Sequence, residues 1–171
     1  MVSSQQLIAA FNRQVGHEMS ASLLYVSIAA YFDSEDLEEL AGFFYRQADE
    51  ERDHAMRFVR YIVDAGGRVE IPALPAPGTE LGTAEEAVAL ALASEETVTQ
   101  QIYDLVEVAQ ADRDHIAQRF LDWFVNEQFE EVSTMNGLLS VVRRAGEGNL
   151  LQVEDYMARR GDPHAAEEET G

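Results

Sequence analysis

Glutamates interrupt four apolar stretches of this chain at positions where the spacing of hydrophobic residues predicts a buried side chain. Glu18 lies in the first stretch, Glu51 in the second and Glu95 in the third, and the fourth contains both Glu127 and Glu131. Apolar residues recur around them every three to four positions, which is the period of an amphipathic helix. Several buried carboxylates in one layer are stable only when most are protonated or a cation binds them. The pattern therefore predicts a metal site between helices.

His54 follows Glu51 by three residues and shares its helix face. Carboxylate ligands with one imidazole suit iron, manganese or zinc, and the small number of nitrogen ligands favours redox-active iron or manganese. Two metal ions close together need a bridging carboxylate, and Glu51 can bridge while the imidazole binds one ion. Single glutamates combined with a Glu-x-x-His motif are typical of helix bundles that hold two metal ions. We therefore expect a di-metal centre.

Each of these features has a simpler interpretation when taken alone. A Glu-x-x-His motif is common on exposed helices, and a single inward glutamate can extend its carboxylate to water. Tyr25, two turns beyond Glu18, is either an ordinary core aromatic residue or a hydrogen-bonding or redox partner of the site. His17 faces another side of the helix. The agreement of four helices favours a metal centre over four separate polar defects.

Periodicity predicts four long helices and a short fifth one, with no competing strand pattern. The predicted segments are 7–32, 37–65, 83–109, 116–145 and 150–157, with 68–82 as a long proline-containing connection. Thr83 and Glu86 have the spacing of a capping box at the start of the third helix. The long connection lets the second and third helices run parallel, so the fold class is an all-α four-helix bundle with one crossover. Residues 1–160 are expected to form this domain, and 161–171 a polar, mobile tail.

The composition narrows the function classes. The 171 residues include 32 acidic and 12 basic side chains, all of the latter arginine, and the net charge is −20 with 46% apolar residues. Nucleic-acid binding through a basic face is disfavoured, because the chain has few cationic side chains to neutralise phosphate groups. An anionic membrane surface would also repel the chain. The lack of cysteine excludes disulfides, thiolate sites and iron–sulfur clusters. With no signal-peptide pattern and no long apolar run, we expect a soluble cytoplasmic protein.

Four segments resemble the corresponding segments of bacterial non-haem ferritins. They are HEMSASLLY (17–25), ADEERDHA (48–55), SEETVTQQI (94–102) and FLDWFVNEQFEEV (120–132), in order and with compatible spacing. The resemblance implies a homo-oligomeric hollow cage of twenty-four subunits, each a four-helix bundle with a short fifth helix. It also implies that the protein oxidises Fe(II) with dioxygen or peroxide and stores the ferric oxide inside the cage.

The same resemblance implies how two iron ions are bound. The first iron would be held by Glu18, Glu51 and His54. The second would share the bridging Glu51 and would also be held by Glu95 and Glu131. These residues would form the catalytic di-iron centre.

The resemblance extends to residues around that centre. Gln128 would lie near the second iron, and Tyr25 would lie beside the centre. A third iron site of the bacterial type would draw on four glutamates: Glu50, Glu127, Glu130 and Glu131.

Haem is not expected in this chain. A bacterioferritin carries a methionine directly after the bridging glutamate, where this chain has Arg52. It also repeats Glu-x-x-His on the fourth helix, where Glu130 and Thr134 stand in place of the histidine. The acidic pair that lines a threefold pore in many ferritins is replaced by Gln118 and Leu121. The sequence therefore does not identify the route by which iron enters.

Two other functions are compatible with the residues. One is a di-metal iron or manganese oxidase, or a catalase-like bundle, without storage. The other is a structural acidic bundle. The overall acidity fits either a cavity that concentrates cations or a compositional bias, which the absence of lysine would also reflect.

Overall fold

The described chain is entirely helical apart from its connections. The computed structural model describes residues 3–78 and 80–160, so the expected tail at 161–171 lies outside the described residues. The elements are α1 (Gln5–Ser34), α2 (Glu38–Asp64), α3 (Ala84–Ala111), α4 (His115–Ala145), the 3₁₀ turn η1 (Glu147–Asn149) and α5 (Leu150–Arg160). No helix among the described residues is long and apolar enough to cross a membrane. The predicted all-α fold is confirmed.

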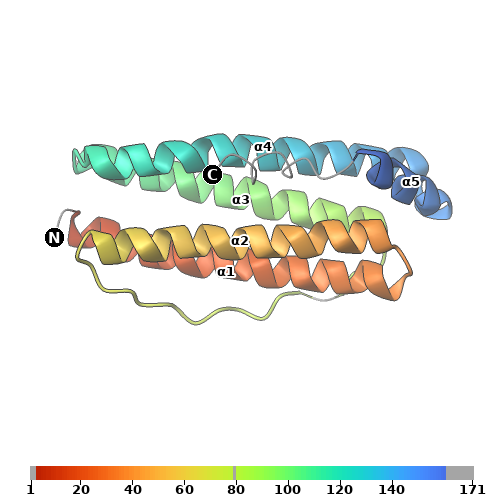
Figure 1. Cartoon of the computed structure of the whole chain (residues 1–171), viewed down its shortest axis with the longest axis horizontal. Coiled ribbons are helices and arrows are strands. Elements are labelled where there is room, and N and C mark those ends of the chain that lie inside the picture. The colour runs from red at the N-terminus through yellow and green to blue at the C-terminus, as the bar shows by residue number, and fades with distance from the viewer. Residues whose placement is uncertain (1–2, 79, 161–171) are drawn as a thin grey trace.

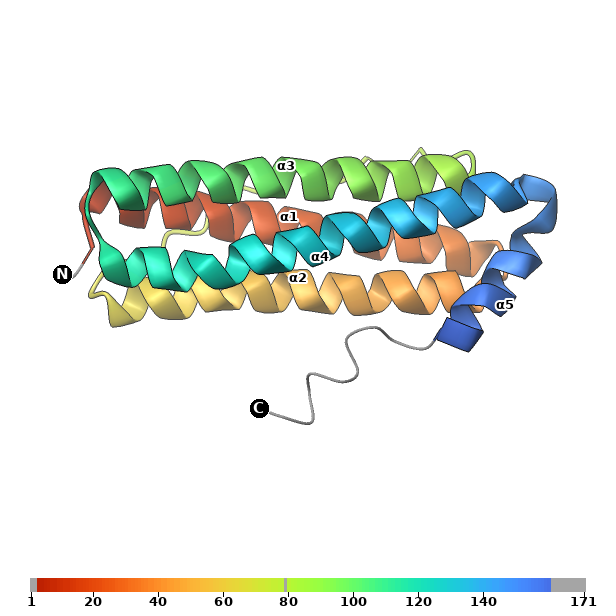
Figure 2. The same cartoon turned by 90° about the horizontal axis from the view of Figure 1, so that it is seen from above.

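The long connection determines the topology. A tight turn joins α1 to the antiparallel α2, and the next segment then travels back along the bundle, so that α3 starts at the same end as α2 (Figure 1). The second and third helices are therefore parallel, as the sequence predicts, and α4 runs antiparallel to α3 (Figure 2). The short α5 lies across the end of the bundle where α2 begins (Figure 2).

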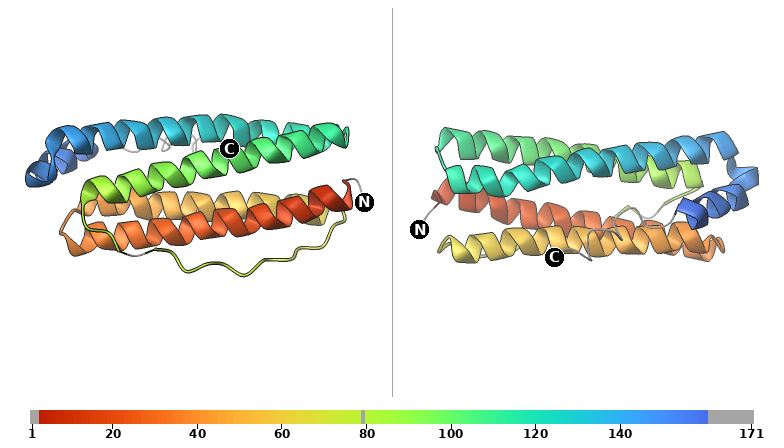
Figure 3. Two further views of the ribbon diagram at one scale, coloured as in Figure 1. Left: turned by 180° about the vertical axis from the view of Figure 1, so that it is seen from behind. Right: turned by 45° about the horizontal axis from the view of Figure 1, so that its top comes forward.

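The connection runs along the outer side of α1 (Figure 3). A Cβ atom at Gly16 would lie 2.3 Å from Cγ of Pro72, and a proline ring has little freedom to withdraw, so this contact requires glycine. Asn12 fastens the connection further, because its Nδ2 donates to the carbonyl of Arg68 at 2.9 Å and its Oδ1 accepts from the N–H of Glu70 at 2.7 Å. The connection is thus tied to α1.

The helices begin and end close to the predicted positions, at capping side chains and at a glycine. The hydroxyl of Thr83 accepts from the N–H of Glu86 at 3.1 Å, as a capping box requires. The carboxylate of Glu86, however, accepts from the N–H of Gly82 at 3.1 Å rather than from that of Thr83, so the expected reciprocal box is only half formed. Asp114 caps α4, and Gly66 follows α2 with a positive φ of 76°.

A polar layer divides the core into two apolar clusters. One cluster lies at the α5 end and includes Tyr25, Phe44 and Met135. The other lies towards the opposite end and includes Phe11 and Phe124. The buried polar side chains between the clusters are Gln14, Glu18, Gln47, Glu51, His54, Glu95, Gln128 and Glu131. Interruption of the apolar seams at one level in all four helices is thus confirmed.

The buried stripe of α3 agrees with the predicted one at Val88, Ile102 and Ala109 and differs from it at the positions between them. Ala91, Val98 and Leu105 are buried, whereas Leu92 and Val106, which we expected to face inward, are only half-buried. The first half of this helix has apolar residues at adjacent positions, so hydrophobic spacing alone does not define its inner face. The predicted burial of Glu95 is unaffected by this difference, because Glu95 lies on both the predicted and the observed stripe.

A carboxylate of α5 caps α2. The N–H groups of Glu39 and Leu40 donate to the carboxylate of Glu154 at 2.7 and 2.9 Å. Leu37, the residue before α2, offers no side-chain cap of its own. The negative charge of Glu154 also complements the positive end of the helix dipole. The fifth helix therefore supplies a cap that the sequence around Leu37 lacks.

Replacing Glu154 with alanine should loosen both α5 and the first turn of α2. The lost cap is expected to cost about 1 kcal/mol. Hydrogen exchange at the amides of Glu39 and Leu40 measures the effect. Asp155→Ala is the control, because its side chain is 77% exposed and pairs with Arg159 only at 4.0 Å. Equal protection of the α2 amides in both variants would contradict this function of the cap.

Candidate metal centre

The polar layer contains six of the predicted site residues and draws at least one from each long helix. They are Glu18 from α1, Glu51 and His54 from α2, Glu95 from α3, and Gln128 and Glu131 from α4, and none of them is more than 4% exposed. The apolar residues on either side of the layer place these side chains inside the bundle. Folding thus creates a compact, largely acidic site that is shielded from water.

Glu18, Glu51 and His54 form the tightest group. One ligand atom from each lies within 4.8 Å of the other two, and among the described residues no other group of three or more potential ligands meets this limit. Ligand atoms around one ion with bonds of about 2.1 Å lie up to about 4 Å apart, so small side-chain rotations would place all three on one cation. Oε2 of both glutamates and Nδ1 of His54 are buried, and no residue in the described ranges forms a hydrogen bond with them. A bound cation would satisfy them.

Neutral donors from two helices hold Glu95. The hydroxyl of Tyr25 donates to its Oε1, and Nε2 of Gln128 donates to its Oε2 at 3.0 Å. The same nitrogen of Gln128 also contacts Oγ1 of Thr99 at 3.3 Å. Tyr25 is therefore a hydrogen-bonding partner of the site, which decides between the two interpretations that the sequence allowed.

Glu131 is the least compensated carboxylate of the layer. It is fully buried, and neither of its oxygens has a hydrogen-bond partner among the described residues. Burial, followed by the nearby charges of Glu95 and Glu51, raises the pKa of Glu131 well above its ordinary value. The site without metal therefore favours a protonated carboxyl here, and a cation would have to displace that proton.

Burial is also the main influence on the other three glutamates. It raises the pKa of Glu18 well above the ordinary value, and repulsion by Glu51 adds to this effect. The pKa of Glu51 is likewise raised well above the ordinary value by burial and then by Glu95. The pKa of Glu95 is also raised by burial, although the hydrogen bonds from Tyr25 and Gln128 oppose the shift.

The residues expected to form a third site lie at the edge of the layer. Glu50 is half-buried and accepts a hydrogen bond from Nε2 of Gln47. Glu127 is also half-buried, with its Oε1 3.8 Å from Nε2 of His54. Glu130 is exposed and does not enter the buried layer. These three side chains thus range from half-buried to exposed.

One expected orientation on α4 is corrected by the structure. The spacing of Phe124 with later residues placed Glu127 on the buried stripe, but the fully buried positions are Gln128 and Glu131. The buried stripe of α4 passes through Gln128 rather than through Glu127, so Glu127 lies at the border of this stripe. Leu121, which we compared with pore-lining residues, is fully buried in the core of the subunit.

Two buried glutamines near the centre were not recognised as site residues from the sequence. Nε2 of Gln14 donates to Oε1 of Glu18 at 2.9 Å. Gln47 donates to Glu50, and its Oε1 is buried without a partner. The available signal was their spacing, because Gln14 precedes Glu18 by four residues and Gln47 precedes Glu51 by four, so each pair lies one helical turn apart.

An aromatic side chain covers His54. The indole of Trp123 meets the imidazole edge-on, with ring centroids 5.4 Å apart and an interplanar angle of 74°. The guanidinium carbon of Arg57 lies over the Trp123 ring, 3.8 Å from its centre. These contacts limit the rotation of the histidine and separate it from solvent.

Comparison with known proteins gives a consistent assignment. Residues 8–145 match the family model described as the ferritin-like domain. Ferritin BfrB of Mycobacterium tuberculosis is 44% identical over 166 residues, covering 92% of this chain and 91% of the relative. A bacterial non-heme ferritin of Staphylococcus haemolyticus is 40% identical over 159 residues, covering 92% and 96%. An open-pore ferritin of the archaeon Archaeoglobus fulgidus superimposes with a TM-score of 0.88 at 32% identity, covering 91% and 96%.

Proposed function

Because this chain belongs to the ferritin family and is an iron-storage protein, we propose that its buried carboxylate layer is a ferroxidase centre. The family membership confirms the resemblance found in the sequence. The observation that carries the proposal is the group of Glu18, Glu51 and His54, whose ligand atoms lie within 4.8 Å of one another inside an apolar core. A buried acidic group with unpartnered oxygens suits a divalent substrate cation such as Fe(II).

The proposed reaction uses two Fe(II) ions as substrates. Each loses one electron, and dioxygen takes up both electrons and two protons to give hydrogen peroxide. When peroxide is the oxidant, the same two electrons and two protons give two molecules of water. Anionic oxygen ligands stabilise Fe(III) more than Fe(II), so the carboxylates favour the oxidised product. The redox chemistry belongs to the iron, and the protein supplies position and charge.

The residues of the layer divide between the two ions. Glu18 and His54 bind the first ion, and Glu51 bridges to the second. Glu95 and Glu131 complete the second site. Supporting this division, Glu18 and His54 group with Glu51, and the pKa of Glu131 responds to the charges of both Glu95 and Glu51.

The half-buried and exposed glutamates provide a third iron site and an exit. Glu50, Glu127 and Glu130 share this site with Glu131 in the proposal. Supporting it, their exposure increases from the buried Glu131, through Glu50 and Glu127, to Glu130 at the surface. A ferric ion leaving the centre would therefore meet carboxylates that are progressively more hydrated, which favours its transfer towards a mineral.

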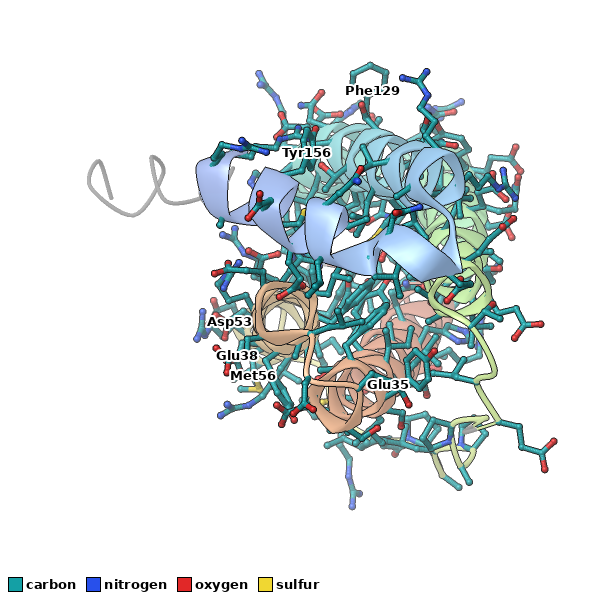
Figure 4. The ribbon with its side chains drawn as sticks, turned by 90° about the vertical axis from the view of Figure 1, so that its right-hand side faces the viewer. Glu35, Glu38, Asp53, Met56, Phe129 and Tyr156 are labelled. Carbon is teal, nitrogen blue, oxygen red and sulfur yellow. The ribbon has the colours of Figure 1, made fainter. Side chains whose placement is uncertain are left out.

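The proposal includes assembly into a cage of 24 subunits. Large apolar side chains stand exposed on several elements, among them Phe129 at 78%, Leu151 at 75% and Ile116 at 60%. Phe129 projects outward from α4, away from the bundle core (Figure 4). Contacts between subunits would bury such side chains. The absence of haem, of nucleic-acid and membrane partners, and the cytoplasmic location stay predictions.

Anaerobic titration with Fe(II), followed by admission of air, tests the function. We expect saturation at about two or three ions per chain, then a rise in ferric absorbance. The particle should elute far above the 19.1 kDa of one chain. A protein that binds no Fe(II) would support a structural acidic bundle instead. Rapid oxidation by a small oligomer that retains no mineral would support a di-metal oxidase.

A further inference from the structure

The buried amide of Gln14 has no part in the ligand sets described above. Gln14 lies on α1, one turn before Glu18, and is 2% exposed. Its Nε2 donates to Oε1 of Glu18 at 2.9 Å and lies 3.5 Å from Oε1 of Gln101 on α3. Acceptors on two different helices therefore fix the direction of one buried NH₂ group.

The hydrogen bond from Gln14 distinguishes the two oxygens of Glu18. Oε1 accepts from the amide, whereas Oε2 is buried and has no hydrogen-bond partner in the part of the chain that the structure describes. An amide NH₂ group can only donate, so it engages a carboxylate oxygen and cannot itself replace that oxygen as a ligand. The bond thus engages one oxygen of Glu18 and leaves Oε2 as the oxygen that can bind a cation without competition from a donor.

Glu95 has a corresponding arrangement on another helix pair. Nε2 of Gln128 donates to Oε2 of Glu95 at 3.0 Å. Glu131, in contrast, has two buried oxygens without partners, and Glu51 has one. Glutamine support therefore goes to Glu18 and Glu95, which are one carboxylate from the ligand set of each ion in the proposed centre. The bridging Glu51 receives none from either glutamine.

We propose that Gln14 is a positioning residue that holds Glu18 as a one-oxygen ligand of the first metal ion. This inference rests on the proposed function, because Gln14 acts through Glu18. Without the amide, Glu18 can rotate and lose the orientation that directs Oε2 to the cation. Hydrogen bonds that orient metal ligands typically contribute about 10- to 100-fold to metal affinity or activity. The competing interpretation is a purely structural tie between α1 and α3.

Gln14→Leu and Gln14→Met test the proposal in the assembled protein. Both variants remove the donor, and Met also keeps the length and flexibility of the side chain. Anaerobic calorimetry with Fe(II) should show binding of the first ion weakened about tenfold. Mössbauer spectra with ⁵⁷Fe(II) should show reduced occupancy of the first site and unchanged occupancy of the second. A purely structural tie would not change one site selectively.

Asn12→Leu provides a matched control. Asn12 is also buried on α1, but within the described part of the chain its amide bonds only to the backbone of the connection, at Arg68 and Glu70. This variant should lower the unfolding temperature and keep wild-type Fe(II) affinity. Wild-type affinity in both Gln14 variants would overturn the positioning role, as would an equal loss of affinity in Asn12→Leu.

Glu51→Ala separates the failure of this inference from the failure of the proposed function. If Glu51→Ala binds and oxidises Fe(II) as the wild type does, the centre itself is wrongly assigned. If Glu51→Ala loses activity while both Gln14 variants bind Fe(II) normally, the centre stands and only the positioning role is removed.

Discussion

Replacing Glu51 with alanine is expected to slow Fe(II) oxidation about a hundredfold. Loss of a group that merely orients a ligand already costs up to about a hundredfold, and Glu51 is itself the ligand shared by both iron ions in the proposed centre. Its removal leaves Glu18 and His54 without a third partner for the first ion. It also separates that ion electronically from the second. The initial rate of ferric absorbance increase, at two Fe(II) per chain, measures the effect.

Unfolding of Glu51→Ala would not explain such a loss of rate, because removing this carboxylate also removes a buried charge that destabilises the fold. Burial and the charge of Glu95 raise the pKa of Glu51, so the folded iron-free chain is destabilised by ionising this carboxyl. Asp53→Ala is the matched control, because Asp53 is exposed on the same helix and points away from the bundle (Figure 4). Asp53→Ala should oxidise Fe(II) at the wild-type rate. A Glu51→Ala rate within twofold of that control would show that oxidation occurs elsewhere.

Much of the candidate site could be predicted because polar residues interrupt apolar seams at one level. Glu18, Glu51 and Glu95 each follow an apolar residue of the same helix by three positions, and burial of a carboxylate there can be predicted from the sequence alone. The prediction for Glu127 was less accurate, because its neighbour Gln128 also fits the helical period. Hydrophobic spacing locates a buried stripe to within one position. An error of one position decides whether a side chain is predicted to be buried or half-buried.

Side-chain partners across helices could not be predicted from spacing. Tyr25 donates to Glu95, a residue 70 positions away on α3, so only the packing of α1 against α3 reveals the contact. Gln14 is a local neighbour of Glu18, yet its second contact, Gln101, also comes from α3. The capping residue Glu86 could reach either of two adjacent N–H groups, and the local backbone selects that of Gly82.

Replacing Glu131 with glutamine should stabilise the iron-free protein at neutral pH and weaken its stabilisation by iron. The folded-state pKa of Glu131 is raised, so the native state holds a proton that the unfolded chain releases above about pH 4.3. The stability of the wild type should therefore fall as pH rises above that value, until the raised folded-state pKa is passed. Glutamine does not titrate, and its amide can donate to the neighbouring carboxylates.

The predicted difference between Glu131→Gln and wild type grows with pH. Near pH 4.5 the two iron-free proteins should unfold at similar temperatures, and near pH 8 the variant should be more stable by about 1–3 kcal/mol, the cost of a buried group without partners. Anaerobic Fe(II) should then stabilise the wild type more than the variant, because only the wild type supplies this anionic ligand. Glu130→Gln, at the exposed neighbouring position, should change neither quantity. A Glu131→Gln protein that is less stable than wild type at pH 8 without iron would contradict the assignment of Glu131 as a carboxylate held in place for a cation.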